Sequence, residues 1–194
     1  MQQVAASPAA PPARQPVTAE QLVEISQDDT HRYELIQGEL IVMSPAGGRH
    51  GKLASRLHIA IGVFVEEHAL GEALAAETGY RLTQNPDTVL APDVSLILSA
   101  NLPPGRITEA FIPGAPDLVV EVLSPSDTAI RIAVKVQTWL RHGTQLVWVV
   151  EPETEAVTVY RPDGNVTLLK SGDSLDGEQV LPGFSYSLDA LFRK

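Results

Sequence analysis

Residues 117–150 constrain the fold more strongly than any other part of the chain, because they read as two buried strands joined by one amphipathic helix. The strands Asp117–Leu123 and Gln145–Val150 are almost continuously apolar, which is typical of strands covered on both faces. The predicted helix is capped at Ser124-Pro125-Ser126 and runs to His142, with apolar residues every three to four positions. A strand–helix–strand order implies two parallel strands linked by a right-handed crossover. The sequence therefore predicts an α/β fold.

The remaining segments extend this unit into a single domain, which we predict to span residues 18–194. An Ala/Pro-rich leader, residues 1–17, has no hydrophobic period and is expected to be disordered. The first expected elements are a helix that begins with a capping box at Thr18 and Gln21 and runs to Ser26, and a hairpin over Tyr33–Met43 that turns at Gln37-Gly38. A long helix, His50–His68, is then ended by Gly71 and is followed by strands Ala73–Leu82 and Pro92–Leu98 and a loop over Ser99–Pro116. After the strand–helix–strand unit we expect two strands joined across residues 162–165 and a helical turn at Leu188–Phe192.

Composition and short motifs exclude several kinds of site. The 194 residues include no cysteine, so disulfides, thiolate metal centres and cysteine nucleophiles are excluded. No run approaches the roughly 18 apolar residues that a membrane span needs, and the N-terminus lacks the basic and apolar regions of a secretory signal. The chain has no Gly-x-Ser-x-Gly motif and no His-x-x-x-His motif. We therefore expect a soluble cytoplasmic protein.

Basic residues gather in one part of an otherwise acidic chain. The net charge is −10, from 14 basic and 24 acidic residues, which argues against a nucleic-acid surface over the whole molecule. Acids are absent from residues 40–65, however, where Arg49, Lys52 and Arg56 recur on the predicted long helix. We expect these three to contact DNA phosphates, which would position a duplex without reading its bases. An ordinary solvated helix face accounts for the same charges equally well.

Two carboxylates stand inside apolar strands, where a charge is costly. Asp93 lies in Ala91–Leu98 and Glu121 lies in Val119–Leu123. A charged group in a buried strand costs several kcal/mol unless it is paired, hydrogen-bonded or metal-bound. A single such acid is usually part of a structural ion pair, but two on consecutive buried strands, each near a strand end, favour a shared site. Two oxygen ligands with spare coordination suit Mg²⁺ or Mn²⁺.

Lys135 is the third candidate for this site. It lies on the predicted second helix, at the edge of the apolar face and close in angle to Trp139. Because that helix returns along the strand that carries Glu121, the ammonium can reach the same carboxylates. There it would stabilise an attacking hydroxide or a pentavalent phosphate. Alternatively, the lysine stem covers Trp139 and the amine reaches solvent, or Lys135 forms a purely structural ion pair with Glu121 or Asp93.

Several short motifs, taken in order, resemble one known family. They are Tyr33-Glu34-Leu35-Ile36-Gln37-Gly38-Glu39-Leu40, Met43-Ser44-Pro45 followed by His50, Pro92-Asp93, Glu121-Val122-Leu123-Ser124-Pro125-Ser126, Val147-Trp148-Val149-Val150-Glu151-Pro152 and Leu181-Pro182-Gly183-Phe184. Together they resemble the Uma-two family of restriction-endonuclease-like proteins, within the PD-(D/E)XK nuclease superfamily. The resemblance extends from Tyr33 almost to the C-terminus.

The resemblance implies a restriction-endonuclease-like fold, in which a mixed central sheet is flanked by helices and followed by an antiparallel meander. It implies Asp93 and Glu121 as metal ligands, and we add the backbone carbonyl of Val122 as a third donor. The superfamily lysine normally stands where this chain has Leu123, and in this family it is moved to the following helix, which here corresponds to Lys135.

Glu39 and His50 also match family positions. Glu39 is then a further acidic site residue, and His50 orients water or phosphate at the start of its helix. A surface role for the acid and a capping role for the histidine are equally compatible with the sequence.

The function implied is metal-dependent hydrolysis of DNA phosphodiester bonds by a Mg²⁺- or Mn²⁺-dependent endodeoxyribonuclease. Relatives often cut both strands as homodimers, so we expect a homodimer. The alternative is a catalytically weak or inactive relative that acts as a DNA-binding or protein-interaction module. Arg131 and Val134 favour that alternative, because the family usually has acidic residues at these two positions.

Overall fold

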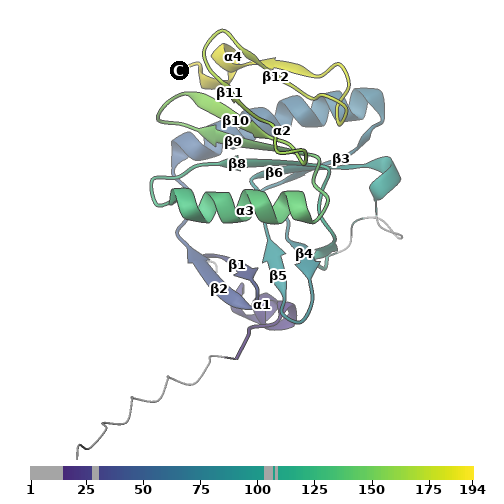
Figure 1. Cartoon of the computed structure of the whole chain (residues 1–194), viewed down its shortest axis with the longest axis vertical. Helices are drawn as coiled ribbons and strands as arrows, with labels where there is room; N and C mark the ends of the chain where they lie inside the picture. The colour runs from purple at the N-terminus through teal and green to yellow at the C-terminus, as the bar shows by residue number, and fades with distance from the viewer. Residues whose placement is uncertain (1–14, 28–30, 103–106, 108) are drawn as a thin grey trace, which may run out of the picture.

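The computed structural model describes residues 15–27, 31–102, 107 and 109–194 and contains two main sheets flanked by helices (Figure 1). Most of the predicted leader, residues 1–14, lies outside the described residues. The six-stranded sheet has the order β11-β10-β9-β8-β6-β3, and the five-stranded sheet has the order β2-β1-β5-β4-β7. The two sheets, connected by α2 and by short loops, form the α/β architecture expected from the sequence.

The bounds of the elements are as follows. The helices are α1 (Ala19–Ile25), α2 (Gly48–His68), α3 (Ala129–Arg141) and α4 (Leu188–Phe192), with a 3₁₀ turn at Ser99–Asn101. The six-stranded sheet contains β3 (Gly71–Ala75), β6 (Val94–Leu98), β8 (Leu118–Val122), β9 (Leu146–Glu151), β10 (Ala156–Tyr160) and β11 (Val166–Leu169). The five-stranded sheet contains β1 (Arg32–Ile36), β2 (Glu39–Met43), β4 (Tyr80–Thr83), β5 (Thr88–Leu90) and β7 (Ile112–Pro113), and a small hairpin contains β12 (Ser174–Asp176) and β13 (Ser185–Ser187).

The predicted crossover unit forms the middle of the six-stranded sheet. Strands β8 and β9 are parallel, with α3 between them in the chain, which confirms the predicted pairing. Strands β9, β10 and β11 are joined by antiparallel pairings, as the predicted meander requires. Strand β8 also pairs with β6, in the antiparallel direction. The sheet is therefore mixed, with Glu121 inside β8 and Asp93 immediately before the neighbouring strand β6.

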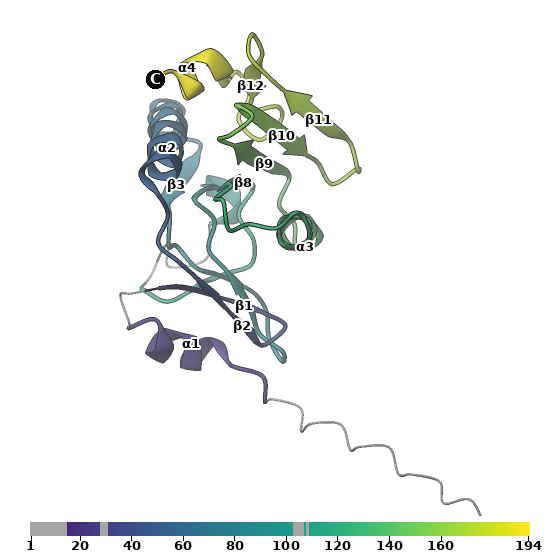
Figure 2. The same ribbon diagram turned by 90° about the vertical axis from the view of Figure 1, so that its left-hand side faces the viewer.

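Helices cover both faces of this sheet, α2 on one side and α3 on the other (Figure 2). Val120 and Val122 pack into the hydrophobic core on the α2 side, while Val119 packs into the core that contains Trp139 of α3. Successive side chains of a strand point to opposite faces. Glu121, which is two residues from Val119, therefore points toward α3 rather than α2.

The hairpin β1–β2 and the α1 helix were predicted with nearly the observed bounds. Thr18 and Gln21 form the predicted capping box, in which each residue hydrogen-bonds to the backbone of the other. The hairpin turns at Gln37 and Gly38, both with positive φ. Val17, which falls in the predicted leader, differs from expectation, because its N–H donates to the Gly38 carbonyl.

Three predicted boundaries are wrong. The single strand predicted over Ala73–Leu82 is two strands, β3 and β4, in different sheets with a turn at residues 76–79. Gly71 does not end α2, since the left-handed residue after that helix is Ala69. Gly71 instead lies within β3, where a Cβ would overlap the Ile97 carbonyl of β6. The α3 helix is capped by Thr128 rather than by residues 124–126.

Asp87 holds α1 against the five-stranded sheet. Its Oδ2 accepts the Ala19 N–H at 2.6 Å, and both of its carboxylate oxygens accept hydrogen bonds from Arg81, at 3.1 and 3.0 Å. Burial alone would raise the pKa of Asp87, but these hydrogen bonds outweigh it, and the pKa lies below its ordinary value. The carboxylate is therefore a stabilising contact for the N-terminal part of the domain.

Asp87→Asn is expected to lower the free energy of unfolding by about 1–3 kcal/mol at neutral pH, because it removes charge-assisted hydrogen bonds. The folded pKa lies below the unfolded value, so this stabilisation is present above the ordinary pKa of aspartate and is lost as the pH falls through the folded pKa. Urea denaturation of both proteins at about pH 7 and about pH 3 measures the effect. A difference that stays constant with pH would contradict the assignment.

Within the described residues, no helix combines the length and the apolar character that are needed to cross a membrane.

Candidate active site

The acids predicted to share a site lie close together where the two sheets meet. Asp93 immediately precedes β6, and Glu121 is the penultimate residue of β8, its antiparallel neighbour. The Asp93 N–H donates to the Val120 carbonyl, and Asp93 Oδ2 accepts the Val122 N–H at 2.8 Å. The start of β6 therefore lies beside the end of β8, which brings both carboxylates to the same region.

Glu121 is held by two donors from α3. It is only 5% exposed, and its Oε1 accepts a hydrogen bond from Trp139 Nε1 at 2.8 Å. Its Oε2 accepts a hydrogen bond from Lys135 Nζ at 2.9 Å. Lys135 and Trp139 are four residues apart, so they lie on the same face of the helix. One face of α3 thus fixes both oxygens of the buried carboxylate.

The Lys135 ammonium lies between one acid of each sheet. Besides Glu121 of the six-stranded sheet, it contacts Glu34 Oε1 of β1 at 3.0 Å. Glu34 is 2% exposed, and the same Oε1 atom accepts the Ala91 N–H at 2.9 Å. Lys135 itself is 6% exposed. The buried ammonium is therefore a link between the two sheets.

The electrostatics of the cluster follow from this crowding. Burial raises the pKa of Glu121 to about 7, with the charges of Asp93 and Glu34 acting in the same direction and Lys135 opposing them. Burial alone would lower the pKa of Lys135, but the carboxylates of Glu121 and Glu34 raise it above its ordinary value. Lys135 is thus held as a cation, while Glu121 is a carboxylate whose charge is costly without a further positive partner.

Asp93 has further partners on the side away from α3. His50 Nε2, at the start of α2, lies 3.1 Å from Asp93 Oδ2, and Arg32 Nη2 of β1 lies 3.5 Å from Oδ1. Burial alone would raise the pKa of Asp93, but His50, the Val122 N–H and Lys135 together lower it. Asp93 is therefore charged at neutral pH.

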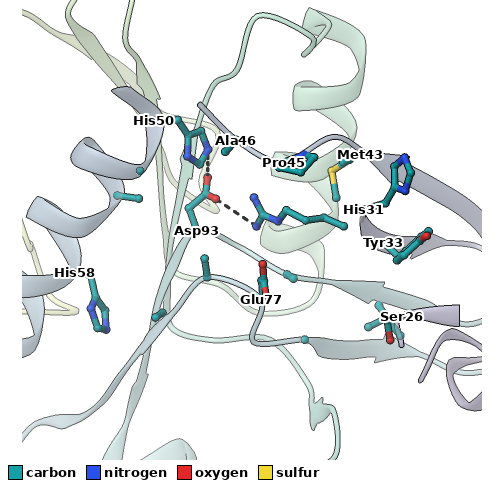
Figure 3. A pocket seen from close by; sticks show the side chains of 18 of the residues that line it. Ser26, His31, Tyr33, Met43, Pro45, Ala46, His50, His58, Glu77 and Asp93 are labelled. Carbon is teal, nitrogen blue, oxygen red and sulfur yellow. Dashed lines mark hydrogen bonds and ion pairs between the residues drawn. The ribbon is translucent and has the colours of Figure 1, made fainter. Parts of the chain in front are cut away.

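A pocket of about 760 Å³ opens onto this side of the cluster. Figure 3 shows His50 pointing at Asp93, with His58 further along α2 and His31 on the opposite wall. Arg32 and Glu77 also line the pocket. Glu121 and Lys135 do not line it, so a ligand in the pocket would meet Asp93 and His50 first.

Comparison with known proteins identifies the family of this chain. The family model Uma2, described as "Putative restriction endonuclease", matches residues 19–190. The chain belongs to the Uma2 family. No significant match to a curated protein was found.

One solved structure similar to this Uma2 chain is described as a putative nuclease belonging to DUF820, from Anabaena variabilis ATCC 29413. The two chains share 22% sequence identity, with a TM-score of 0.79, and the match covers 91% of this chain and 98% of the other. At this identity the comparison establishes the fold, which is the restriction-endonuclease-like fold expected from the sequence motifs.

The Uma2 chain brings together most of the residues predicted for the site, but not Glu39. Asp93, Glu121, Lys135, His50 and Val122 are joined by the contacts given above. Glu39 is exposed at the start of β2 and pairs with Ile36, at the opposite end of the hairpin from Arg32. The buried acid that the hairpin contributes is Glu34 instead. The structure thus does not bring Glu39 to the cluster, and a role for it as a site residue stays a prediction.

The predicted phosphate-binding residues of α2 also lie elsewhere. Lys52 Nζ donates to the Arg193 carbonyl at 2.9 Å, Arg56 Nη1 donates to the Leu191 carbonyl at 2.6 Å, and Arg49 pairs with Glu155 at 3.2 Å. The pocket instead receives His50 and His58 from a different face of the same helix. Lys52 and Arg56 therefore fasten the C-terminal segment, and Arg49 pairs with the turn between β9 and β10. The DNA contact expected of these three residues stays a prediction.

Two charged residues that approach the site were not predicted. Arg32 and Glu34 alternate along β1, so both point to the same face of the hairpin, toward Asp93 and Lys135. The sequence did contain a signal for Glu34. A charged residue directly before Leu35 and Ile36 in a short strand is unusual if its own face of the strand is buried. The sequence did not reveal which face a second sheet would cover.

The donor set at the site fits a divalent cation that prefers oxygen. Asp93 and Glu121 supply two neighbouring carboxylates. Each Glu121 oxygen keeps a second lone pair beside the hydrogen bond it accepts, and so does Asp93 Oδ1, whose partner is Arg32 at 3.5 Å, while Asp93 Oδ2 faces both the Val122 N–H and His50. Among the described residues, no group of three or more His, Asp or Glu side chains is arranged to hold a metal. Mg²⁺ commonly binds through one or two carboxylates and completes its shell with waters and phosphate oxygens. Two acids therefore suffice for such an ion.

Proposed function

We propose that this Uma2 protein is a divalent-metal-dependent endonuclease that hydrolyses DNA phosphodiester bonds, with Asp93, Glu121 and Lys135 as its catalytic residues. The family assignment indicates a nuclease. The observation that carries the finer proposal is the meeting of two carboxylates and one ammonium from β6, β8 and α3 beside an open pocket. This combination can bind a cation and also stabilise negative charge on a phosphate.

Asp93 and Glu121 would hold Mg²⁺ or Mn²⁺, with the Val122 carbonyl as a third donor, and the bound ion would supply an activated water and neutralise phosphate charge. The raised pKa of Glu121 supports a cationic partner at this position, because burial and the neighbouring acids make its negative charge costly.

Lys135 would act on the phosphate rather than on the cation. Of the three N–H groups of its ammonium, one donates a hydrogen bond to Glu121 and a second faces Glu34 in an ion pair at 3.0 Å. The third N–H is left for an oxygen that gains negative charge as the bond to the nucleophile forms. A single donor of this kind is worth about 3 kcal/mol in the transition state. His50, in contact with Asp93 at the pocket wall, would orient water or phosphate.

Incubation of the purified protein with supercoiled and linear DNA in Mg²⁺ or Mn²⁺ tests this proposal. The expected result is nicking that requires the metal, stops with a chelator, and is lost in Asp93→Asn. Nicking that continues in Asp93→Asn would refute the assignment of the site. Metal-independent DNA binding by the intact protein, with no cleavage, would favour the non-catalytic module instead.

Two further expectations stay predictions, namely a cytoplasmic location, expected from the sequence, and a homodimer, expected from the family resemblance. Sedimentation of the protein at micromolar concentration tests the homodimer directly. Only monomer in that experiment would contradict it.

A further inference from the structure

We infer that Glu34 is a positioning residue of the proposed nuclease, which fixes the Lys135 ammonium so that its remaining N–H is directed at the scissile phosphate. The inference rests on the proposed function. It concerns a residue outside the three catalytic side chains, contributed by the hairpin β1–β2 rather than by the six-stranded sheet.

The first support is how Glu34 itself is held. Its side chain is 2% exposed, and its Oε1 accepts the Ala91 N–H at 2.9 Å. Ala91 lies between β5 and Asp93, on the segment that leads from the five-stranded sheet into β6. The carboxylate is therefore anchored to the backbone beside the site and is not free to follow the lysine.

The second support is the geometry at the ammonium. Lys135 Nζ lies 3.0 Å from Glu34 and 2.9 Å from Glu121, at almost equal distances from one acid of each sheet. With a single acid, the ammonium would be free to rotate about its contact with Glu121. Two anchored acceptors from different sheets define its orientation, and hence the direction of the third donor.

The third support is that β1 also places a charged partner beside Asp93. Arg32 precedes Glu34 by two residues and points to the same side, where its guanidinium lies 3.5 Å from Asp93. One strand thus contributes a cation to one catalytic residue and an anion to another. A strand that served packing alone would be expected to bury apolar side chains at these alternating positions.

Glu34→Gln isolates the charge of this residue, because the amide oxygen still accepts the Ala91 N–H. Glu34→Asp keeps the charge but shortens the side chain by one methylene. Glu72→Gln, an exposed acid of β3, is the matched control for removing one charge. If Glu34 positions Lys135, both Glu34 variants should lower kcat for plasmid nicking by about 10–100-fold, with KM and the Mn²⁺ dissociation constant within about threefold of the wild type.

A second readout does not need activity. In protein labelled with ¹⁵N-lysine, the buried Lys135 ammonium should give a slowly exchanging signal in the wild type and in Glu72→Gln. In both Glu34 variants that signal should shift or broaden through faster exchange with water.

The outcomes separate the inference from the function on which it rests. Unchanged kcat and an unchanged Lys135 signal in Glu34→Gln would overturn the inference while leaving a working nuclease. Parallel loss of kcat and of Mn²⁺ binding would also overturn it, because Glu34 would then belong to the metal site. Wild-type protein that neither binds Mn²⁺ nor nicks DNA would refute the proposed function itself.

Discussion

Lys135→Met is expected to lower the free energy of unfolding by about 3–5 kcal/mol, because it removes the cation from a buried cluster and leaves two acids without it. Glu34 and Glu121, 2% and 5% exposed, both contact this ammonium in the folded protein. Methionine has a similar length, so the packing of the stem against α3 is largely kept. The loss is therefore electrostatic, and urea denaturation at neutral pH measures it.

Two further variants test this prediction more closely. Glu34→Gln in the Lys135→Met background should recover part of the lost stability, since one of the two unpaired acids is then neutral. Lys170→Met, which removes an exposed lysine, should change the free energy of unfolding by no more than about 0.5 kcal/mol. A loss below about 1 kcal/mol in Lys135→Met would mean that this ion pair does not have the buried character described.

Glu121→Gln is expected to show the opposite balance. Hydrolysis should fall about 10³-fold or more, equal to roughly 4 kcal/mol of transition-state stabilisation. The free energy of unfolding should fall by only about 1–3 kcal/mol, because one of the two buried donors loses its acceptor. The amide removes a buried charge whose pKa is raised to about 7, while its oxygen can still accept a hydrogen bond from Lys135 or Trp139. Lys135 also keeps Glu34 as its anionic partner. An acid retained for chemistry is often neutral or costly for stability.

Plasmid nicking and urea denaturation of the same preparations check this prediction. Glu66→Gln, an exposed acid of α2, serves as the control for removing one negative charge. If Glu121→Gln unfolds as easily as Lys135→Met but still cuts DNA, Glu121 is a structural partner of the lysine. The catalytic assignment would then be wrong at that residue.

The proposed catalytic cluster was accessible from the sequence because charges in apolar strands are conspicuous. Asp93 and Glu121 stood out against their neighbours, and the crossover topology explained how Lys135 returns to Glu121. These inferences depend on local patterns and on the order of a few elements. The contacts at 2.8–2.9 Å among these elements match them.

The contributions of the second sheet were not accessible in the same way. Glu34 and Arg32 sit in a five-residue strand, and their importance depends on which face of the hairpin meets α3 and β6. The split of Ala73–Leu82 into β3 and β4 had the same cause, since a turn at residues 76–79 sends the chain to the other sheet. The alternation of side chains along a strand does not specify which element will cover each face of that strand.

The basic residues of α2 illustrate a different limit. Their spacing correctly placed them on one region of a helix, but charge alone does not distinguish DNA phosphate from a backbone carbonyl as partner. The carbonyls of Leu191 and Arg193 come from the end of the chain, more than a hundred residues away. Contacts of this range arise from the tertiary fold and leave no trace in the local sequence.

Anomalous diffraction from crystals soaked in Mn²⁺ is the most direct test of whether two strands of this sheet cooperate at a cation. The account predicts one strong peak within coordinating distance of both the Asp93 and Glu121 carboxylates, absent from crystals of Asp93→Asn grown and soaked in the same way. A peak bound to only one of these acids, or Mn²⁺ located away from both, would contradict it.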